Sequence, residues 1–188
     1  MIINWNAALE AIAADIITNA NHEPKERLPK EEQVRSALAN WFRANGAAAT
    51  HFEAGYSDVD KPGQHPECDL RVVLEDGHEI WIEMKGGTAD APSFGHNAKP
   101  AESLYGWLSD VEKLQSAPEG ATRAFFLVGL RQHGHTGKLF SPGHLDRVTA
   151  AIKKSFEVPA IECVRKEVTF DAWREIAPVE VVAHSWIW

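Results

Sequence analysis

Residues 67–85 constrain the fold more than any other part of the sequence, because two apolar runs there flank the dipeptide Asp76-Gly77. Runs of this kind on either side of Asp-Gly are typical of a β-hairpin. If the loop held only those two residues, Leu70 would pair with Glu83. Asp69 would then point away from the face that carries Glu83, since side chains alternate along a strand.

A three-residue loop, Glu75-Asp76-Gly77, with Gly77 in the left-handed conformation, shifts the pairing by one residue. Leu70 then faces Ile82. One side of the hairpin becomes almost wholly apolar, and the other gathers three groups of catalytic type, Asp69, Glu83 and Lys85. The sequence therefore predicts the three-residue loop, because this register separates the apolar side chains from the polar ones.

In that register the carboxylates of Asp69 and Glu83 lie opposite each other on neighbouring strands, close enough to share one divalent cation. Mg²⁺ prefers oxygen ligands of this type. It would relieve their mutual repulsion, lower the pKa of a bound water and offset charge that develops on a phosphate. Lys85, on the same face, would hold the attacking water or stabilise the transition state. The alternative is an ordinary solvated sheet face, where Glu-x-Lys pairs are common.

An Asp at the start of a hairpin followed by Glu-x-Lys at its end resembles the signature of the PD-(D/E)XK nuclease superfamily. The resemblance implies a restriction-endonuclease-like fold and a nuclease that hydrolyses phosphodiester bonds of nucleic acid, with DNA favoured as the substrate. It implies that Asp69 and Glu83 ligate Mg²⁺ or Mn²⁺ and that Lys85 assists the attack. It also implies that the backbone carbonyl of Met84 completes the ligand set. The family name has Pro directly before the Asp, where this sequence has Cys68, which is expected to be a buried thiol and not a nucleophile.

The order of the predicted elements extends the resemblance over residues 30–130. Apolar patterns predict a helix at 30–45, a strand at 51–54, the hairpin, a helix at 100–115 and a buried strand at 124–130. This is the αβββαβ core of the superfamily, with a mixed central sheet flanked by helices. Gly86-Gly87 is expected to end the second strand of the hairpin. Leu108 is expected in the apolar stripe of the helix at 100–115. The resemblance implies that a polar or basic residue of this helix lies near the scissile phosphate, for which Lys113 and Gln115 are open, but a solvated face is favoured for both.

The helix at 30–45 carries the remaining candidate acids. In the superfamily, a helix before the sheet often supplies a Glu that positions the metal or its water, and Glu32 occupies that place here. Glu31 is adjacent and stays open as the alternative. A structural role for both acids, at the positive end of the helix dipole, has equal weight. Glu53 in the first strand is a weaker candidate.

The remaining segments are expected to complete one domain, residues 1–188. Residues 1–29 form an N-terminal arm with a helix at 4–19, and residues 131–188 add a helix at 143–156 and strands at 160–170 and 179–188. Trp186 and Trp188 end the chain and are expected to pack into the domain or into a dimer contact.

Composition limits the class of protein. The content of hydrophobic residues, 44%, is ordinary for a soluble globular domain, and no segment has the pattern of a signal peptide or a membrane span. With two cysteines, Cys68 and Cys163, a framework of disulfide bonds is not expected, which favours the reducing cytoplasm as the location. The net charge of -8 argues against broad nonspecific binding of nucleic acid.

Two other functions stay open. The same fold would serve as a protein-binding or regulatory module, for which an acidic surface is natural. Relatives in this superfamily also act as homodimers or beside a larger protein complex. A zinc site on three histidines, His133, His135 and His144, is the third hypothesis, because two imidazoles at positions i and i+2 can share a face.

Overall fold

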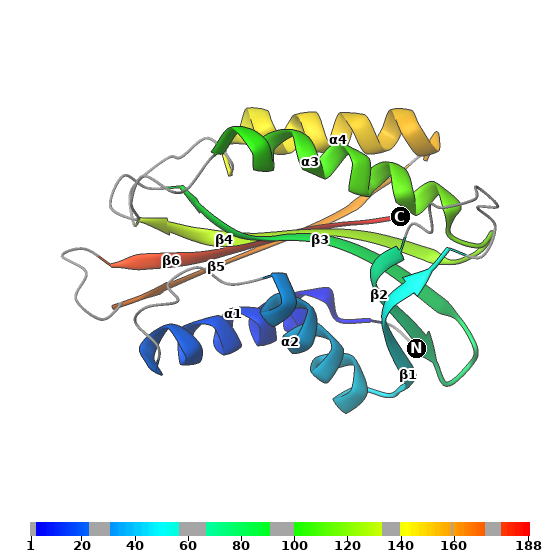
Figure 1. The fold of residues 1–188 in the computed structure, drawn as a ribbon, viewed down its shortest axis with the longest axis horizontal. Helices are drawn as coiled ribbons and strands as arrows, with labels where there is room; N and C mark the ends of the chain where they lie inside the picture. Colours follow the sequence, from blue (N-terminus) through cyan, green and yellow to red (C-terminus); the bar gives the residue numbers. More distant parts are fainter. Residues whose placement is uncertain are drawn as a thin grey trace.

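The computed structural model describes residues 3–22, 31–56, 67–90, 100–132, 140–158, 160–171 and 178–188. It has three layers, with a six-stranded mixed sheet in the middle (Figure 1). The strands are β1 (Ala47–Gly55), β2 (Glu67–Leu74), β3 (Glu79–Asp90), β4 (Thr122–Gln132), β5 (Glu162–Phe170) and β6 (Val179–Ile187), in the spatial order β1-β2-β3-β4-β6-β5. The helices are α1 (Trp5–His22), α2 (Glu31–Ala44), α3 (Pro100–Lys113) and α4 (Pro142–Phe156). The predicted class, α/β with a mixed sheet flanked by helices, is confirmed.

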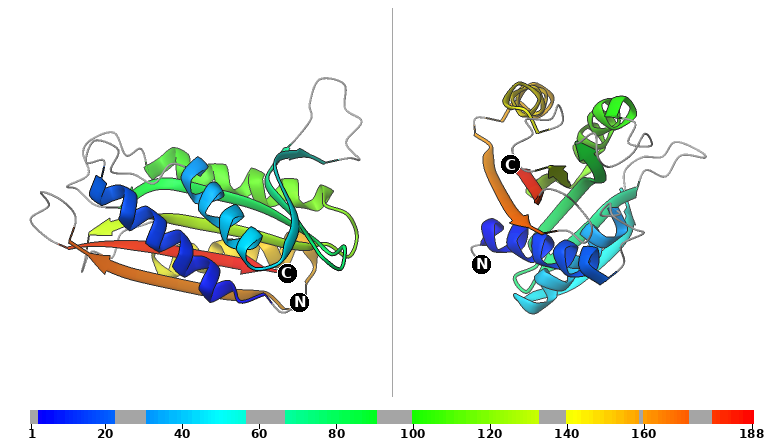
Figure 2. Two further views of the ribbon diagram at one scale, coloured as in Figure 1. Left: turned by 90° about the horizontal axis from the view of Figure 1, so that it is seen from below. Right: turned by 90° about the vertical axis from the view of Figure 1, so that its left-hand side faces the viewer.

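Each face of the sheet is covered by a pair of helices. Helices α1 and α2 lie on one face, and α3 and α4 lie on the other, as the end-on view in Figure 2 shows. Strands β1, β2 and β3 form an antiparallel meander, and α3 then carries the chain across to β4, which is parallel to β3. Strand β6 lies antiparallel between β4 and β5. The element order predicted for residues 30–130 is therefore present.

The β2–β3 hairpin has the predicted three-residue loop. Leu74 donates its amide hydrogen to the carbonyl oxygen of His78 at 2.9 Å, and Gly77 has a φ of 82°. Leu70 pairs with Ile82. One residue further along, this antiparallel register places Asp69 opposite Glu83.

Strand β3 does not end at Gly86-Gly87, so the prediction from the sequence is wrong here. It continues to Asp90, and its pairing with β4 shifts register between Lys85 and Thr88. Glycine accommodates an irregularity of this kind within a paired strand, so the two glycines bend β3 instead of terminating it. The bend lies directly after the catalytic candidates.

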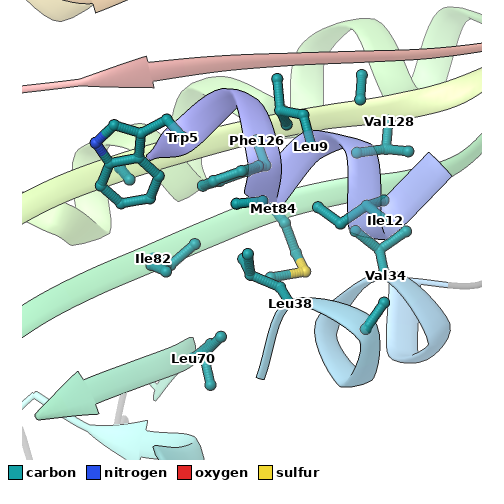
Figure 3. Packing of buried hydrophobic residues seen from close by; sticks show 14 of the residues in the cluster. Trp5, Leu9, Ile12, Val34, Leu38, Leu70, Ile82, Met84, Phe126 and Val128 are labelled. Carbon is teal, nitrogen blue, oxygen red and sulfur yellow. The ribbon is translucent and has the colours of Figure 1, made fainter. Parts of the chain in front are cut away.

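The apolar side of the hairpin packs against α1 and α2. Leu70, Ile82 and Met84 point toward these helices and are fully buried (Figure 3). Apolar side chains of the two helices are buried with them, namely Trp5, Leu9, Ile12, Ile16, Val34, Leu38 and Phe42. The apolar side of the hairpin is therefore covered by α1 and α2, and the polar side chains on its other side face α3.

The second core lies between the sheet and helices α3 and α4. It contains Trp107, Val111 and Phe125, together with Leu145, Val148 and Ile152 of α4. Trp186 from β6 is fully buried there, so the aromatic end of the chain packs inside the domain. Leu108 contradicts its prediction, since 39% of its surface is exposed.

Neither cysteine is in a disulfide, and Cys68 is buried in β2. Burial, with the charge of Glu83 nearby, raises the pKa of Cys68 to about 12. The thiolate required of a nucleophile is therefore not populated near neutral pH. Among the residues described, no helix is long and apolar enough to cross a membrane.

Candidate functional site

Asp69 and Glu83 meet on the sheet face that is turned toward α3. The carboxylate of Asp69 accepts a hydrogen bond from the backbone amide of Met84, with Oδ2 2.7 Å from the nitrogen. This bond ties the start of β2 to the middle of β3 and fixes Asp69 beside Glu83. The predicted role of the Met84 carbonyl oxygen as a metal ligand stays a prediction.

Glu83 is fully buried, and only one of its two carboxyl oxygens accepts a hydrogen bond from the described residues. Oε1 accepts a hydrogen bond from the hydroxyl of Tyr56 at 2.8 Å. Oε2 accepts none from the residues that the structure describes, and Lys113 Nζ lies 3.5 Å away. Burial, together with the charge of Asp69, raises the pKa of Glu83 to about 9. The site therefore favours either a proton or an added cation at this carboxyl group.

Near Asp69 and Glu83, two lysines share one buried carboxylate. Asp110 on α3 has 4% of its surface exposed. Its Oδ2 lies 2.7 Å from Lys85 Nζ, and its Oδ1 lies 2.9 Å from Lys113 Nζ. Burial alone would lower the pKa of Lys85, but the hydrogen bond with Asp110 and the charges of Asp110, Glu31 and Asp69 together outweigh it, so the pKa is above its usual value. The pKa of Lys113 is also raised, so both ammonium groups are kept charged around Asp110, and that of Lys113 lies 3.5 Å from Glu83 Oε2.

Helix α2 brings Glu31 closer to the site than Glu32. Glu31 Oε2 lies 3.7 Å from Lys85 Nζ, and burial raises the pKa of Glu31 above its usual range. Glu32 is exposed and lines the adjacent cavity. Of the two acids that the sequence left open, Glu31 is the one in contact with a catalytic candidate.

Gly86 permits this approach of α2. A Cβ atom at Gly86 would lie 3.1 Å from Glu31 Cα and 3.3 Å from Val34 Cγ2. The backbone of β3 after Lys85 therefore touches the first turn of α2. A side chain at this position would push the helix and Glu31 away.

Gly86→Ala is accordingly expected to lower the free energy of unfolding by about 1–3 kcal/mol, the usual effect of overpacking. Gly55→Ala is the matched control, because a Cβ there meets no atom within 4 Å. Thermal denaturation of both variants measures the difference. Equal melting temperatures would show that α2 does not press on β3 at Gly86.

A cavity of about 750 Å³ opens beside the carboxylates. Its lining contains five acidic side chains and a single basic one, with Glu31, Glu32, Arg35, Glu53, Glu67, Cys68, Asp69 and Gly86 around it. A cavity so rich in carboxylates attracts cations. It is also large enough for a phosphate group and its water molecules.

Glu53 enters this lining in a strained conformation. Its φ is 51°, in the left-handed region that β-strand residues other than glycine rarely adopt. Phe52 pairs with Leu70 and Ala54 with Cys68, so Glu53 lies beside Asp69 on the neighbouring strand. Its carboxylate contacts Arg35 at 3.1 Å. Strain of this kind is often found at functional sites.

The described side chains fit Mg²⁺ or Mn²⁺ as a site of two carboxylates. Among them, no group of three or more His, Cys, Asp or Glu side chains is arranged to hold a metal ion. Mg²⁺ commonly binds one or two carboxylates and fills its remaining positions with water and substrate phosphate. The buried Oε2 of Glu83, without a hydrogen-bond donor, is the observation that supports such a cation here.

The prediction from the sequence missed or misplaced three residues of this site. Tyr56 and Asp110 were not candidates, and Lys113 was expected on a solvated face. A signal for Asp110 was present, because the buried residues of α3 follow the i, i+3, i+4, i+7 pattern, Trp107, Asp110, Val111 and Leu114. The Asp stands at an inward position of that stripe, and Leu108 points outward.

The zinc hypothesis gains little from the structure. His133 and His135 lie outside the described residues. His144 is buried and packs edge-to-face against Trp107, with the ring centroids 5.9 Å apart. This histidine is part of the second core.

Because a fold of this class hosts many unrelated activities, a function has to be argued from the chemistry of its side chains. The pair Asp69 and Glu83, with the two lysines around Asp110, supplies that chemistry. Protein-family models, curated proteins and solved structures were compared with this chain, and none of them matches it.

Proposed function

We propose that this protein is a metal-dependent nuclease of the PD-(D/E)XK type that hydrolyses phosphodiester bonds, with DNA as the favoured substrate. One observation carries the proposal. Glu83 is a buried acid beside Asp69, and its Oε2 has no hydrogen-bond donor among the described residues. A buried carboxylate pair is unfavourable, and Lys113 Nζ, 3.5 Å from Oε2, offsets this only in part, since the pKa of Glu83 is still raised to about 9. A group perturbed in this way beside a cavity is a candidate for a functional site. The order of elements from α2 to β4 supports a restriction-endonuclease-like fold.

In this proposal Asp69 and Glu83 hold Mg²⁺ or Mn²⁺. When bound, the cation supplies positive charge against a phosphate and favours ionisation of a water molecule. The Met84 amide orients Asp69, and the Tyr56 hydroxyl orients Glu83. Each carboxylate therefore keeps an oxygen free of these bonds.

Lys85 and Lys113 provide the remaining positive charge. Lys85 would donate a hydrogen bond to the attacking water or to a phosphate oxygen, and Lys113 would stabilise the charge that develops on the phosphate. Glu31, 3.7 Å from Lys85, is the supporting acid of α2 in this proposal. Glu32, which is exposed and lines the cavity, has no catalytic role in this proposal.

A protein-binding or regulatory module on the same fold is the second candidate function. It is favoured by the net charge of -8 and by the acidic lining of the cavity, both of which weaken the attraction of nucleic acid. In such a module the carboxylates would bind a basic partner. Metal binding alone would not separate the two functions, but cleavage would.

The experiment that tests the proposal compares cleavage of single-stranded DNA, double-stranded DNA and RNA by the wild type, Asp69→Asn and Lys85→Ala. We expect cutting with Mg²⁺ or Mn²⁺ by the wild type only, while circular dichroism shows that both variants are folded. Cutting that survives both substitutions would place the activity elsewhere. An absence of cutting on all substrates would favour the binding module.

A further inference from the structure

Two arginines of α2 lie close to an exposed aromatic ring at the edge of the sheet. Phe52 in β1 keeps 41% of its surface exposed. The guanidinium carbons of Arg35 and Arg43, both on α2, lie 5.3 Å and 5.7 Å from the centroid of its ring. We call these three residues the Phe52 patch. Strand β1 is the outer strand of the sheet, so the patch faces outward from the molecule.

The Phe52 patch adjoins the cavity of the candidate site. Arg35 belongs to both, since it also lines the cavity. The residue after Phe52 is Glu53, which borders Asp69 and contacts Arg35 at 3.1 Å. A chain molecule that lay across Phe52 would therefore have its next unit at the mouth of the cavity.

The chemistry of the patch matches a nucleotide with an unpaired base. An exposed aromatic face stacks on bases, and guanidinium groups bind phosphate oxygens. In a duplex the base faces are covered by their neighbours, so they cannot stack on a protein side chain without being unstacked. Because the chain has a net charge of -8, attraction spread over the surface cannot hold a duplex, and a local contact has to provide the binding.

We propose that the Phe52 patch binds single-stranded nucleic acid, with a base stacked on Phe52 and neighbouring phosphates held by Arg35 and Arg43. The site would then accept single strands, overhangs or frayed ends in preference to an intact duplex. The preference for cutting such substrates rests on the proposed nuclease function. The binding itself does not, so the two can fail separately.

Binding of a fluorescent oligothymidylate to the full chain, followed by anisotropy in EDTA over a series of salt concentrations, tests the patch. Phe52→Ala should weaken binding about tenfold through the loss of one stacked base. Arg43→Gln should lower the slope of log Kd against log salt by about 0.7, the loss of one phosphate contact on a single strand. Phe52→Ala should leave this slope unchanged.

Two matched controls are available away from the patch. Leu108→Ala removes the other large exposed apolar side chain of the described residues, which is 39% exposed on α3. Arg147→Gln removes an exposed arginine from α4, on the opposite face of the sheet. Both should bind the oligonucleotide as the wild type does.

The proposal is overturned if the wild type does not bind the oligonucleotide, or if Phe52→Ala binds it as tightly as Leu108→Ala does. It is also overturned if Phe52→Ala changes the oligomeric state in sedimentation, because the patch would then be a contact between copies of this chain. Binding that depends on the patch, in a protein that cleaves nothing, would support the patch and reject the nuclease.

Discussion

Glu83→Gln is expected to abolish cleavage and, at the same time, to stabilise the metal-free protein. The amide keeps the size of the acid and still accepts the hydrogen bond from Tyr56, but it carries no charge for a cation. Loss of the cation removes several kcal/mol of transition-state stabilisation, about a thousandfold in rate. The same substitution removes a buried acid whose ionisation the fold opposes. The two effects therefore have opposite signs.

The stability effect has a defined pH dependence. The pKa of Glu83 is raised from 4.5 to about 9 in the folded protein. Between these values the folded state holds a proton that the unfolded chain has released, so the metal-free wild type loses stability as the pH rises through this window. Glu83→Gln removes this slope. At pH 7 we expect it to raise the free energy of unfolding by about 2 kcal/mol, or the melting temperature by about 4–8 °C.

Thermal melts from pH 5 to pH 9 in EDTA measure the effect on stability, because this pH range covers most of the interval over which the pKa of Glu83 is raised. Cleavage assays with Mg²⁺ or Mn²⁺ measure the effect on activity. Glu79→Gln is the matched control, since Glu79 lies on the same strand and its pKa is lowered, chiefly by its hydrogen bond with Arg71. That variant should be no more stable than the wild type and should still cleave. A Glu83→Gln protein that is less stable than the wild type throughout this range would contradict the account of Glu83.

Asp110→Asn is expected to disable the site through its lysines. The substitution keeps the shape of the side chain but removes the charge that holds Lys85 at 2.7 Å and Lys113 at 2.9 Å. Two partly buried ammonium groups would then face each other without a shared anion. Breaking a buried pair destabilises a protein by about 3–5 kcal/mol, and the partial exposure of both lysines reduces this to about 1–2 kcal/mol at pH 7.

We expect the cleavage rate of Asp110→Asn to fall about a hundredfold, because Lys85 is no longer fixed toward the carboxylates. Glu112→Gln, an exposed residue of the same helix, is the control and should behave as the wild type. Urea denaturation and single-turnover cleavage give the two quantities. Wild-type stability and rate in Asp110→Asn would mean that the lysines are held by other groups.

The hairpin and its register could be predicted from the sequence because one local rule decides them. Side chains alternate along a strand, so the apolar set, the turn glycine at Gly77 and the carboxylates at Asp69 and Glu83 all had to agree on one pairing. The stripes of α1, α2 and α4 were equally predictable, since each follows the period of a helix.

The rest of the site depends on contacts between distant segments. The buried carboxylate of Asp110 pairs with Lys85 from β3 as well as with Lys113 of its own helix, and the sequence around Asp110 contains no trace of the partner from β3. Gly86 lies inside β3 because β4 pairs beyond it and α2 touches it. Phe52 was expected in a core strand, but β1 is at the edge of the sheet, where only one neighbour covers it.

The most direct test of the central claim is an anomalous difference map from crystals of the wild type grown with Mn²⁺. The account predicts one strong peak within coordination distance of both Asp69 and Glu83 Oε2, and no peak there in crystals of Glu83→Gln. A peak at the three histidines, or the same peak in both proteins, would contradict a metal site built on Glu83.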